Sequence, residues 1–373
     1  MQQLDARSAA WIVFVVIAST ATLYLPSISI QQAQNAAWLS PLLAVPFGFL
    51  TYGLIRALRR RHPGQSFTAI ALAVFGPVLG RVVVILMAAF LWQAGVIILR
   101  QLLGFIKAFI LLESPILVVD FILSLAIWLA LRYRVTVLSK VNQRVGFALA
   151  ALLAILLINT MPDIHMSAFT PWLESGWKGL IRGAIVPATW YSQIVLLIFV
   201  WHEMKPDEAA SLDRRMIWTL LWTTLFLVIV NITVLGVLGV QESARSSFPT
   251  LEIARYVQLG VGVQLQRLDI FFIIPWILAA IFKIIFFYYG ACAIIRDLLQ
   301  HTTFDAFSSA IVFSGAGVVL VVFPKASITS YFISYDWPTY GLFFQIGMPL
   351  LFVIASLVRS RKLTLPSHAG DSS

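Results

Sequence analysis

Long apolar runs, separated by short polar or basic segments, form the dominant pattern of this chain. Most runs hold about 20 residues, the length at which an α-helix crosses a hydrocarbon core about 30 Å thick. We therefore predict an all-α integral membrane protein with ten transmembrane helices, at residues 8–30, 37–58, 81–103, 115–131, 145–160, 180–201, 216–240, 267–300, 304–323 and 337–358.

The segments between these runs carry the turn-forming and charged residues. Residues 65–79 are expected to form a cytoplasmic linker or a short interfacial helix. The polar loop 161–177 is expected to lie outside the bilayer, and 241–266 is a long connection with an amphipathic centre. The polar composition of 359–373 predicts a disordered cytoplasmic tail, and residues 1–358 are expected to form a single transmembrane domain.

Composition supports the membrane assignment and excludes several other classes. The chain is 60% apolar and 11% charged, whereas a water-soluble domain has about 25% charged residues. The single cysteine, Cys292, excludes an internal disulfide framework and a cysteine-based zinc site. The first apolar run is long and lacks a small-residue cleavage pattern, so we interpret it as the first membrane helix and not as a signal peptide.

Basic residues are distributed unequally between the two sides of the predicted helices. Seventeen fall on the side that holds both termini: Arg7, Arg56, Arg59, Arg60, Arg61, Arg81, Arg132, Arg134, Lys140, Arg144, Lys205, Arg214, Arg215, Arg296, Arg359, Arg361 and Lys362. Eight fall on the other side: Arg100, Lys107, Lys178, Arg182, Arg245, Arg255, Arg267 and Lys325. The positive-inside rule therefore places both termini in the cytoplasm. A net charge of +10 is explained by these loops, and we expect no nucleic-acid partner.

One ammonium group, Lys283, lies near the midpoint of the run 267–300. A lysine at the centre of a bilayer costs roughly 3 kcal/mol or more unless it faces a protein or water-filled interior. We therefore interpret Lys283 as part of a functional site. The alternative is a structural lysine bonded to helix-end carbonyl groups.

Two of the predicted helices each contain a proline beside small residues. In the first helix Pro26 follows the small residues 18–22, and in the sixth Pro187 follows Gly183. The two helices are five apart, so their halves have opposite orientations in the membrane. Interrupted helices at matching positions of inverted halves indicate a midplane binding site. We expect the backbone to be open at 18–22.

No constellation typical of an enzyme is visible. The five histidines are scattered over loops and helix ends, and no metal-ligand spacing or phosphate-binding loop is present. We therefore expect a protein that is not an enzyme and holds no cofactor or metal.

Several short motifs are recognisable by their order and spacing: Leu25-Pro26, Ala36-Ala37-Trp38-Leu39-Ser40, Arg100 with Lys107, Glu113-Ser114-Pro115, residues 171–176, His202-Glu203-Met204-Lys205, Phe248-Pro249-Thr250, and Gln266-Arg267-Leu268-Asp269 followed by Trp276. Over nearly the whole chain these resemble the B subunits of bacterial spore germinant receptors, the germination permease branch of the amino acid–polyamine–organocation superfamily.

This resemblance implies the leucine-transporter arrangement, with inverted five-helix repeats at about 8–160 and 180–358, broken helices 1 and 6, and a pocket among helices 1, 3, 6 and 8. Carried over by position, the ligand-binding residues would be Ser19, Ala21, Phe90, Ala94, Tyr191, Lys283 and Phe287. It also implies A and C partner subunits and a place in the inner membrane of the spore.

The chain departs from the family pattern at two positions. Relatives often carry an acidic residue where this chain has Ile194, with Gln193 beside it, and can have a small polar residue in place of Lys283. A pocket that loses a carboxylate and gains an ammonium should prefer a different ligand charge. We consider two roles for Lys283, as a replacement for a coupling sodium against helix 1 carbonyls near 18–22, or as a direct contact to an anionic ligand group.

Arg267 and Asp269 stand at the predicted outer mouth, and we interpret them as a gate pair or as a solvated interfacial pair. For the whole chain we weigh three interpretations. These are a germinant-sensing receptor subunit that binds a small nutrient, expected to be an amino acid, a proton-coupled amino-acid transporter of the same fold, and a membrane scaffold without a ligand. The resemblance favours the sensor.

Overall fold

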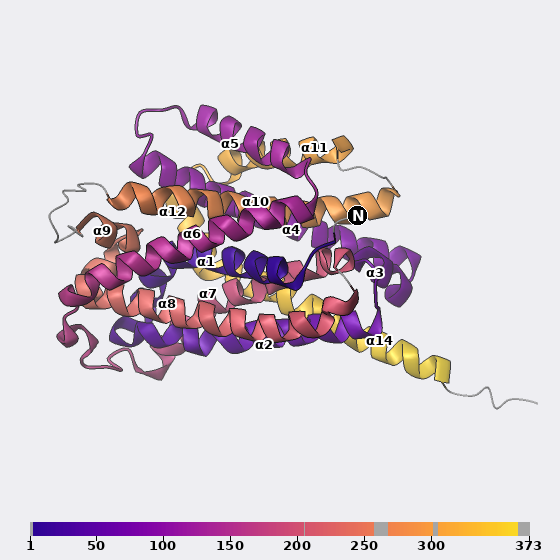
Figure 1. Ribbon diagram of the computed structural model, residues 1–373, viewed down its shortest axis with the longest axis horizontal. Helices are drawn as coiled ribbons and strands as arrows, with labels where there is room; N and C mark the ends of the chain where they lie inside the picture. Colours follow the sequence, from indigo (N-terminus) through magenta and orange to yellow (C-terminus); the bar gives the residue numbers. More distant parts are fainter. Residues whose placement is uncertain (1–2, 205, 257–267, 301–304, 365–373) are drawn as a thin grey trace, which may run out of the picture.

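The computed structural model describes residues 3–204, 206–256, 268–300 and 305–364, and these residues fold almost entirely into helices (Figure 1). Seven helical spans are long and apolar enough to cross a membrane, and the first, Ala6–Arg61, contains two helices. Two shorter apolar helices complete the set. Among the described residues the bundle therefore has the ten membrane helices that the sequence predicts.

The ten membrane helices have the following bounds: α1 Ala6–Ala33, α2 Ser40–Arg61, α4 Pro77–Phe109, α5 Ile116–Leu131, α6 Val135–Thr160, α7 Gly176–Ser192 continued by the 3₁₀ helix η4 Gln193–Phe199, α8 Ala209–Arg245, α10 Leu268–Leu299, α11 Asp305–Val322, and a last helix composed of α12 Ala326–Tyr331, the π segment η7 Phe332–Asp336, α13 Trp337–Leu342, the π segment η8 Phe343–Gly347 and α14 Met348–Thr364. Two short helices lie between them, α3 Phe67–Phe75 and α9 Pro249–Tyr256.

Local sequence signals set several of these boundaries. Asp5 caps α1, because its carboxylate accepts a hydrogen bond from the Ser8 amide at 2.6 Å. Gly76 has φ +81°, a conformation that favours glycine, and it ends α3 where Pro77 begins α4. A short helix, α3, forms within 65–79, where we expected a linker or a short interfacial helix. The helix α9 lies within the connection 241–266, which was expected to have an amphipathic centre.

Two sequence predictions need correction. The fifth membrane helix, α6, begins at Val135 and not at 145, because its first turns carry Lys140 and Arg144, which lowered the apparent hydropathy. The tail predicted to be disordered from Arg359 remains helical to Thr364, since α14 continues through this basic segment.

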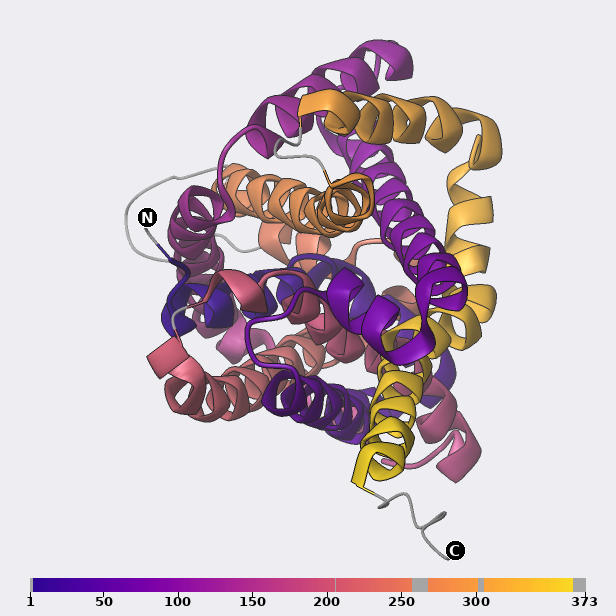
Figure 2. The same cartoon turned by 90° about the vertical axis from the view of Figure 1, so that its right-hand side faces the viewer.

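Both termini of the bundle lie at one end, which we call the N-terminal face; the other end is the opposite face (Figure 1). In Figure 2, which looks toward the N-terminal face, α5 and α11 lie together at one edge of the bundle. The helix α1 packs against α6, α7, α8 and α10, and α10 also packs against α4. These contacts place α1 and α10 inside the bundle.

The helix α1 stays helical through 18–22, so its interruption is not the open backbone that the sequence led us to expect. Instead, Pro26 lacks an N–H group and leaves the carbonyl of Thr22, four residues earlier, without its helical partner. The hydroxyl of Thr250 on α9 donates to that carbonyl at 2.6 Å.

The sixth membrane helix repeats this arrangement. Pro187 frees the carbonyl of Gly183, which accepts a hydrogen bond from the hydroxyl of Ser29 on α1 at 3.2 Å. A Cβ atom at Gly183 would lie 2.9 Å from the Cβ of Ala33, so glycine permits this close approach of α7 to α1. Beyond Ser192 the helix changes to the seven-residue 3₁₀ helix η4, and long 3₁₀ stretches inside helices often mark hinges.

Candidate functional site

A small cavity, called the central cavity below, lies between the helices predicted to form the pocket. Its volume is about 20 Å³, room for roughly one water molecule. Its walls come from α1, α4, α7, η4, α10, η7 and α13, and the lining residues are Thr20, Ala94, Ile97, Ile98, Gln101, Trp190, Gln193, Lys283, Ile333 and Trp337.

The ammonium of Lys283 reaches this cavity from α10. The side chain is fully buried, and Lys283 Nζ donates a hydrogen bond to Thr20 Oγ1 of α1 at 2.6 Å. Because an ammonium has three N–H donors, this bond leaves donor capacity for a further acceptor. The lysine therefore couples α10 to the stretch of α1 that precedes Pro26.

Gln193, at the start of η4, supplies a second polar group to the same cavity. Its side chain is 3% exposed, and its Oε1 atom has no hydrogen-bond partner among the described residues. A buried unpaired acceptor is costly, so it is suited to meet a donor on a ligand. The cavity thus presents an ammonium donor and an amide acceptor, and its lining contains no carboxylate.

A larger cavity of about 350 Å³, called the outer cavity below, opens toward the opposite face. It is lined by Tyr24, Ser27, Ile28, Gln31, Arg100, Gln101, Gly104, Ala108, Arg245, Ser246, Ser247, Phe248, Thr329, Ser330, Ile333 and Ser334. The charged residues in this lining are two arginines, and Arg100 is anchored by a 2.6 Å bond from its Nε to the carbonyl of Phe323. An anionic group entering from this face would meet only positive charge in the lining.

Gln101 and Ile333 line both the outer and the central cavity, so they form the partition between them. The hydroxyl of Tyr24 donates to the backbone carbonyl of Gln101 at 3.1 Å, which holds this turn of α4 against α1. Ile333 lies in the π segment η7, and such segments in helices are frequent at functional sites. Movement of η7 would join the two cavities.

The N-terminal face is closed over the central cavity. The amide of Leu4 donates to the carbonyl of Glu203 at 3.0 Å, and the hydroxyl of Tyr289 on α10 donates to Glu203 Oε1 at 2.5 Å. His202 lies beside them, and burial lowers its pKa against the opposing effect of the Glu203 carboxylate. These hydrogen bonds therefore connect the start of α1, the end of the sixth membrane helix and α10 at the N-terminal face.

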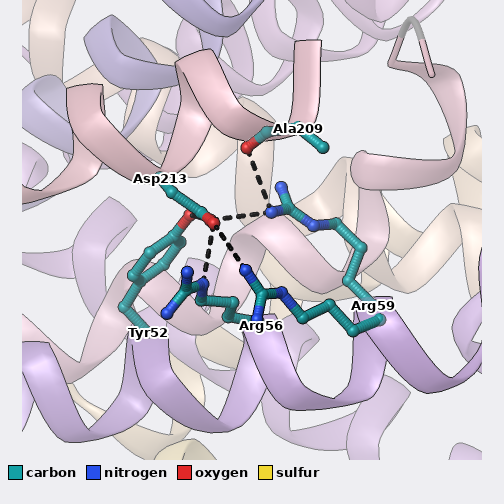
Figure 3. A network of polar contacts seen from close by, with 6 residues as sticks. Tyr52, Arg56, Arg59, Ala209 and Asp213 are labelled. Carbon is teal, nitrogen blue, oxygen red and sulfur yellow. Dashed lines mark hydrogen bonds and ion pairs between the residues drawn. The ribbon is translucent and has the colours of Figure 1, made fainter. Parts of the chain in front are cut away.

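A second set of ties on the same face joins α2 to α8 (Figure 3). The Asp213 carboxylate accepts bonds from Arg56 Nε and Arg59 Nη2, both at 2.7 Å, and from the Tyr52 hydroxyl at 2.6 Å. Arg59 Nη2 also donates to the carbonyl of Ala209 at 3.3 Å. These residues border a cavity of about 890 Å³ that opens at the N-terminal face.

The residues that the resemblance proposed as ligand contacts fall into two groups. Ala94 and Lys283 line the central cavity. The carbonyl of Ser19 accepts a hydrogen bond from the Trp276 indole, and Ala21 is buried in the core.

The three aromatic residues of that set are buried but are not among the lining residues. Phe90 stacks on Trp337, with ring centroids 5.6 Å apart, and so supports a residue that does line the cavity. The Tyr191 hydroxyl donates to Thr224 Oγ1 of α8 at 2.9 Å, and Phe287 is fully buried in the core.

The proposed gate pair lies outside the part of the chain that can be described. Arg267 is not among the described residues, and for Asp269 only the backbone, in the first turn of α10, is described. The sequence analysis also did not single out Gln101, Ile333 or Trp337 as lining residues. A glutamine inside the mainly apolar run at 81–103 was a signal for Gln101, whereas an apolar residue such as Ile333 carries no such signal.

Comparisons with known proteins agree with this architecture. A family model described as "Spore germination protein" matches residues 3–330. Spore germination protein KB of Bacillus subtilis (strain 168) is 22% identical over 264 residues, 70% of each chain. Spore germination protein YndE of the same organism is 20% identical over 295 residues, 78% of this chain and 79% of that protein.

Among solved structures, a Na⁺-coupled sialic acid symporter in a substrate-bound outward-open state superposes with a TM-score of 0.65 at 10% identity, covering 97% of this chain and 91% of the symporter. MHP1, a nucleobase-cation-symport-1 family transporter in a closed conformation, gives 0.56 at 16% identity over 96% and 79% of the two chains. These similarities confirm the leucine-transporter-like fold. The proteins found are germination proteins and transporters, not enzymes.

Proposed function

The chain belongs to the spore germination permease family, and on that premise we propose that it is the germinant-sensing membrane subunit of a spore germination receptor. In this proposal it binds a small nutrient, an amino acid, in the central cavity and signals through A and C partner subunits. Its place is the inner membrane of the spore, with both termini in the cytoplasm and the opposite face outward.

One observation carries the choice of an amino acid. Along the path from the outer cavity to the central one, the charged lining residues are Arg100, Arg245 and Lys283, all of them cations. A ligand carboxylate is attracted by these groups, whereas a purely cationic ligand such as a polyamine is repelled. The unpaired Oε1 atom of Gln193 is an acceptor for the ligand ammonium.

Lys283 has the position expected of a resident cation between two helices. Its ammonium bonds to Thr20, within the segment 18–22 of α1 against which we considered that it could replace a coupling sodium. Because that bond uses one of its three donors, the same ammonium can also meet a ligand carboxylate that enters the cavity. Residues of both α1 and α10 would then contact the ligand, so ligand binding would shift the two helices relative to each other.

Binding requires the walls to move, because about 20 Å³ is far too small for an amino acid. Displacement of η7 and α13, which carry Ile333 and Trp337, would merge the central cavity with the outer cavity of about 350 Å³. A ligand that stabilises this merged arrangement shifts the population toward it. In a sensor, the altered last helix is the signal that partner subunits detect.

The test is a thermal-shift screen of the detergent-purified protein against L-amino acids, sugars and nucleosides, repeated with Lys283→Ala and with Gln193→Ala. We expect stabilisation by one or a few L-amino acids, lost in Lys283→Ala and weakened in Gln193→Ala. A sugar or nucleoside that stabilises both variants as well as the parent protein would contradict the proposal.

A proton-coupled amino-acid transporter is the second candidate, because cavities open toward both faces on either side of the central one. Reconstituted vesicles distinguish the two. Uptake of the stabilising amino acid by the purified chain alone favours a transporter. Binding without uptake, together with a response that requires co-expressed partner subunits, favours the sensor.

A further inference from the structure

A groove on the outer surface of the bundle runs between α1, α6 and α8, away from both the central and the outer cavity. Its volume is about 580 Å³, and its lining residues are Arg7, Ala10, Trp11, Phe14, Ala150, Arg214, Arg215, Trp218, Thr219, Trp222, Leu225, Phe226 and Ile229. All three arginines lie at the end of the groove nearest the N-terminal face, where α1 and α8 begin, and the rest of the lining is mainly apolar. We propose that this groove binds a phospholipid with an anionic headgroup.

The length of the groove suits one leaflet of a membrane. Arg214 and Ile229 mark its extent on α8, and the 15 residue steps from one to the other rise about 22 Å. One leaflet contributes half of a hydrocarbon core about 30 Å thick, which leaves a few ångströms for a headgroup beside the arginines. An acyl chain lying along α8 therefore places its phosphate at Arg214 and Arg215.

The arginines are available to an external anion. Arg7 and Arg214 have no ion pair or hydrogen bond within the described part of the chain, and Arg215 donates from Nε to Ser211 Oγ. The acidic groups closest in sequence are already engaged. Asp213, next to Arg214, accepts from Tyr52, Arg56 and Arg59, and the two others bind the start of α1. Asp5 accepts from the Ser8 amide, and Glu208 accepts from the Ala6 amide at 3.3 Å.

The floor of the groove is built from packed rings. Trp11 and Phe14 meet edge to face with centroids 5.4 Å apart, and Phe14 lies 6.0 Å from Phe226. A Cβ atom at Gly146 on α6 would lie 2.8 Å from the Trp11 ring, so only a glycine at this position leaves room for the ring. The floor is therefore rigid and apolar.

The indoles of Trp218 and Trp222 are 55% and 61% exposed, and they follow Arg214 at intervals of one helical turn. Exposed tryptophans next to basic residues are typical of the level at which lipid headgroups meet chains. A transmembrane helix of a partner fits less well, because acidic residues that could pair with the three arginines are rare in membrane helices.

The first experiment is native mass spectrometry of the detergent-purified full chain titrated with phosphatidylglycerol or phosphatidylcholine of identical acyl chains. We expect a preference for phosphatidylglycerol that falls on the order of 10- to 100-fold in Arg7→Gln/Arg214→Gln/Arg215→Gln, since each basic residue near a headgroup contributes about 1 kcal/mol. The matched control is Arg61→Gln/Arg81→Gln/Arg134→Gln, which removes the same charge from exposed sites on the same face and should keep the preference.

Ala150→Trp separates a defined site from general attraction of anionic lipids. It places an indole inside the groove and leaves every arginine unchanged, so it should also abolish the preference. The proposal is overturned if Ala150→Trp binds phosphatidylglycerol as the parent protein does, or if the control triple variant loses as much as the groove variant. Unfolding temperatures in phosphatidylcholine confirm that each variant is folded.

Quenching by lipids with brominated chains provides an independent readout. Phosphatidylglycerol should quench the intrinsic fluorescence more than phosphatidylcholine, and Trp218→Phe/Trp222→Phe should remove that difference although ten of the twelve tryptophans remain. Equal quenching by both lipids in the parent protein, or protection of these indoles by a co-purifying membrane protein, would overturn the assignment to lipid.

Discussion

Lys283 Nζ lies 2.6 Å from Thr20 Oγ1, and this contact joins α10 to α1 at the wall of the central cavity. The lysine is fully buried, yet this hydroxyl is the hydrogen-bond acceptor found for it within the described chain. A neutral hydroxyl compensates an ammonium only in part. The buried ammonium therefore lowers the stability of the fold.

The first prediction follows from that imbalance. Lys283→Met keeps most of the side-chain volume and removes the charge, so we expect the free energy of unfolding in detergent to stay equal or rise by about 1–3 kcal/mol. Ligand-induced stabilisation should disappear at the same time. Both are read from one thermal or denaturant titration, with and without the amino acid.

Thr20→Val is the matched control for this position. It removes the acceptor and leaves the ammonium buried with less compensation, so unfolding should become easier by about 1–3 kcal/mol. If Lys283→Met destabilised the protein as strongly as Thr20→Val, the lysine would be a structural residue.

A second prediction concerns the carbonyl groups freed by the two prolines. Thr250→Val removes the donor to the Thr22 carbonyl and should cost about 0.5–2 kcal/mol of unfolding free energy. In Pro26→Ala the amide of residue 26 can satisfy that carbonyl, so the same Thr250→Val change should then cost little. The double-mutant cycle measures this coupling.

Ser29→Ala with Pro187→Ala is the equivalent cycle for the Gly183 carbonyl. Coupling should be smaller here, since the Ser29 bond is 3.2 Å long against 2.6 Å for Thr250. Additive effects in both cycles would show that the prolines do not act through these carbonyls.

The third prediction uses the single cysteine, Cys292, which is fully buried. In a Cys292→Ala background, Ser330→Cys in the outer cavity should react with a membrane-impermeant maleimide added outside intact cells. Arg61→Cys should react only after permeabilisation. Thr20→Cys, behind Gln101 and Ile333, should be protected in both cases and become reactive when Ile333→Ala is added.

This pattern tests the orientation as well as the partition between the cavities. Labelling of Arg61→Cys from outside, with Ser330→Cys protected, would reverse the proposed topology. Reaction of Thr20→Cys without the Ile333→Ala change would place the partition elsewhere.

Much of the fold was predictable because a bilayer demands long apolar helices, and these are visible in one sequence. The run 267–300 matches α10, Leu268–Leu299, almost residue for residue. Where helices extend beyond the hydrocarbon, this signal fails. The polar first turns of α6 and the basic end of α14 are helical although hydropathy alone would end the helix.

The lining of the central cavity was predictable where a residue type is out of place in a membrane, and for Ala94 from its position in the family pattern. Lys283 was found because an ammonium in an apolar run is conspicuous, and it does line the central cavity. Tyr191 and Phe287 were named by position, but which way a ring points depends on packing with other helices, such as the contact of Tyr191 with Thr224. The ties of Asp213 to Tyr52, Arg56 and Arg59 span more than 150 residues of sequence and leave no local pattern.

The last prediction ranks the three arginines around Asp213 by burial and distance. The Arg59 side chain is 15% exposed and 2.7 Å from the carboxylate, that of Arg56 is 43% exposed at 2.7 Å, and that of Arg60 is 64% exposed at 3.6 Å. Exposed ion pairs are screened by water and contribute little, whereas removal of one partner from a buried pair leaves an uncompensated charge. We expect Arg59→Gln to lower the free energy of unfolding by about 1–3 kcal/mol, Arg56→Gln by under about 1 kcal/mol, and Arg60→Gln not measurably.

Arg59→Lys sharpens this test, because one guanidinium nitrogen bonds both Asp213 and the Ala209 carbonyl. A lysine has the charge without the planar fork, so it should recover less than half of the loss. Denaturant unfolding in detergent at low and high salt provides the measurement, with Asp163→Asn, an exposed carboxylate on the opposite face, as the control. High salt should reduce any small effect of Arg56→Gln and leave that of Arg59→Gln nearly unchanged, since partly buried pairs are screened less. Equal effects of all three arginines would mean that net charge at this face, and not the tie between α2 and α8, determines its stability.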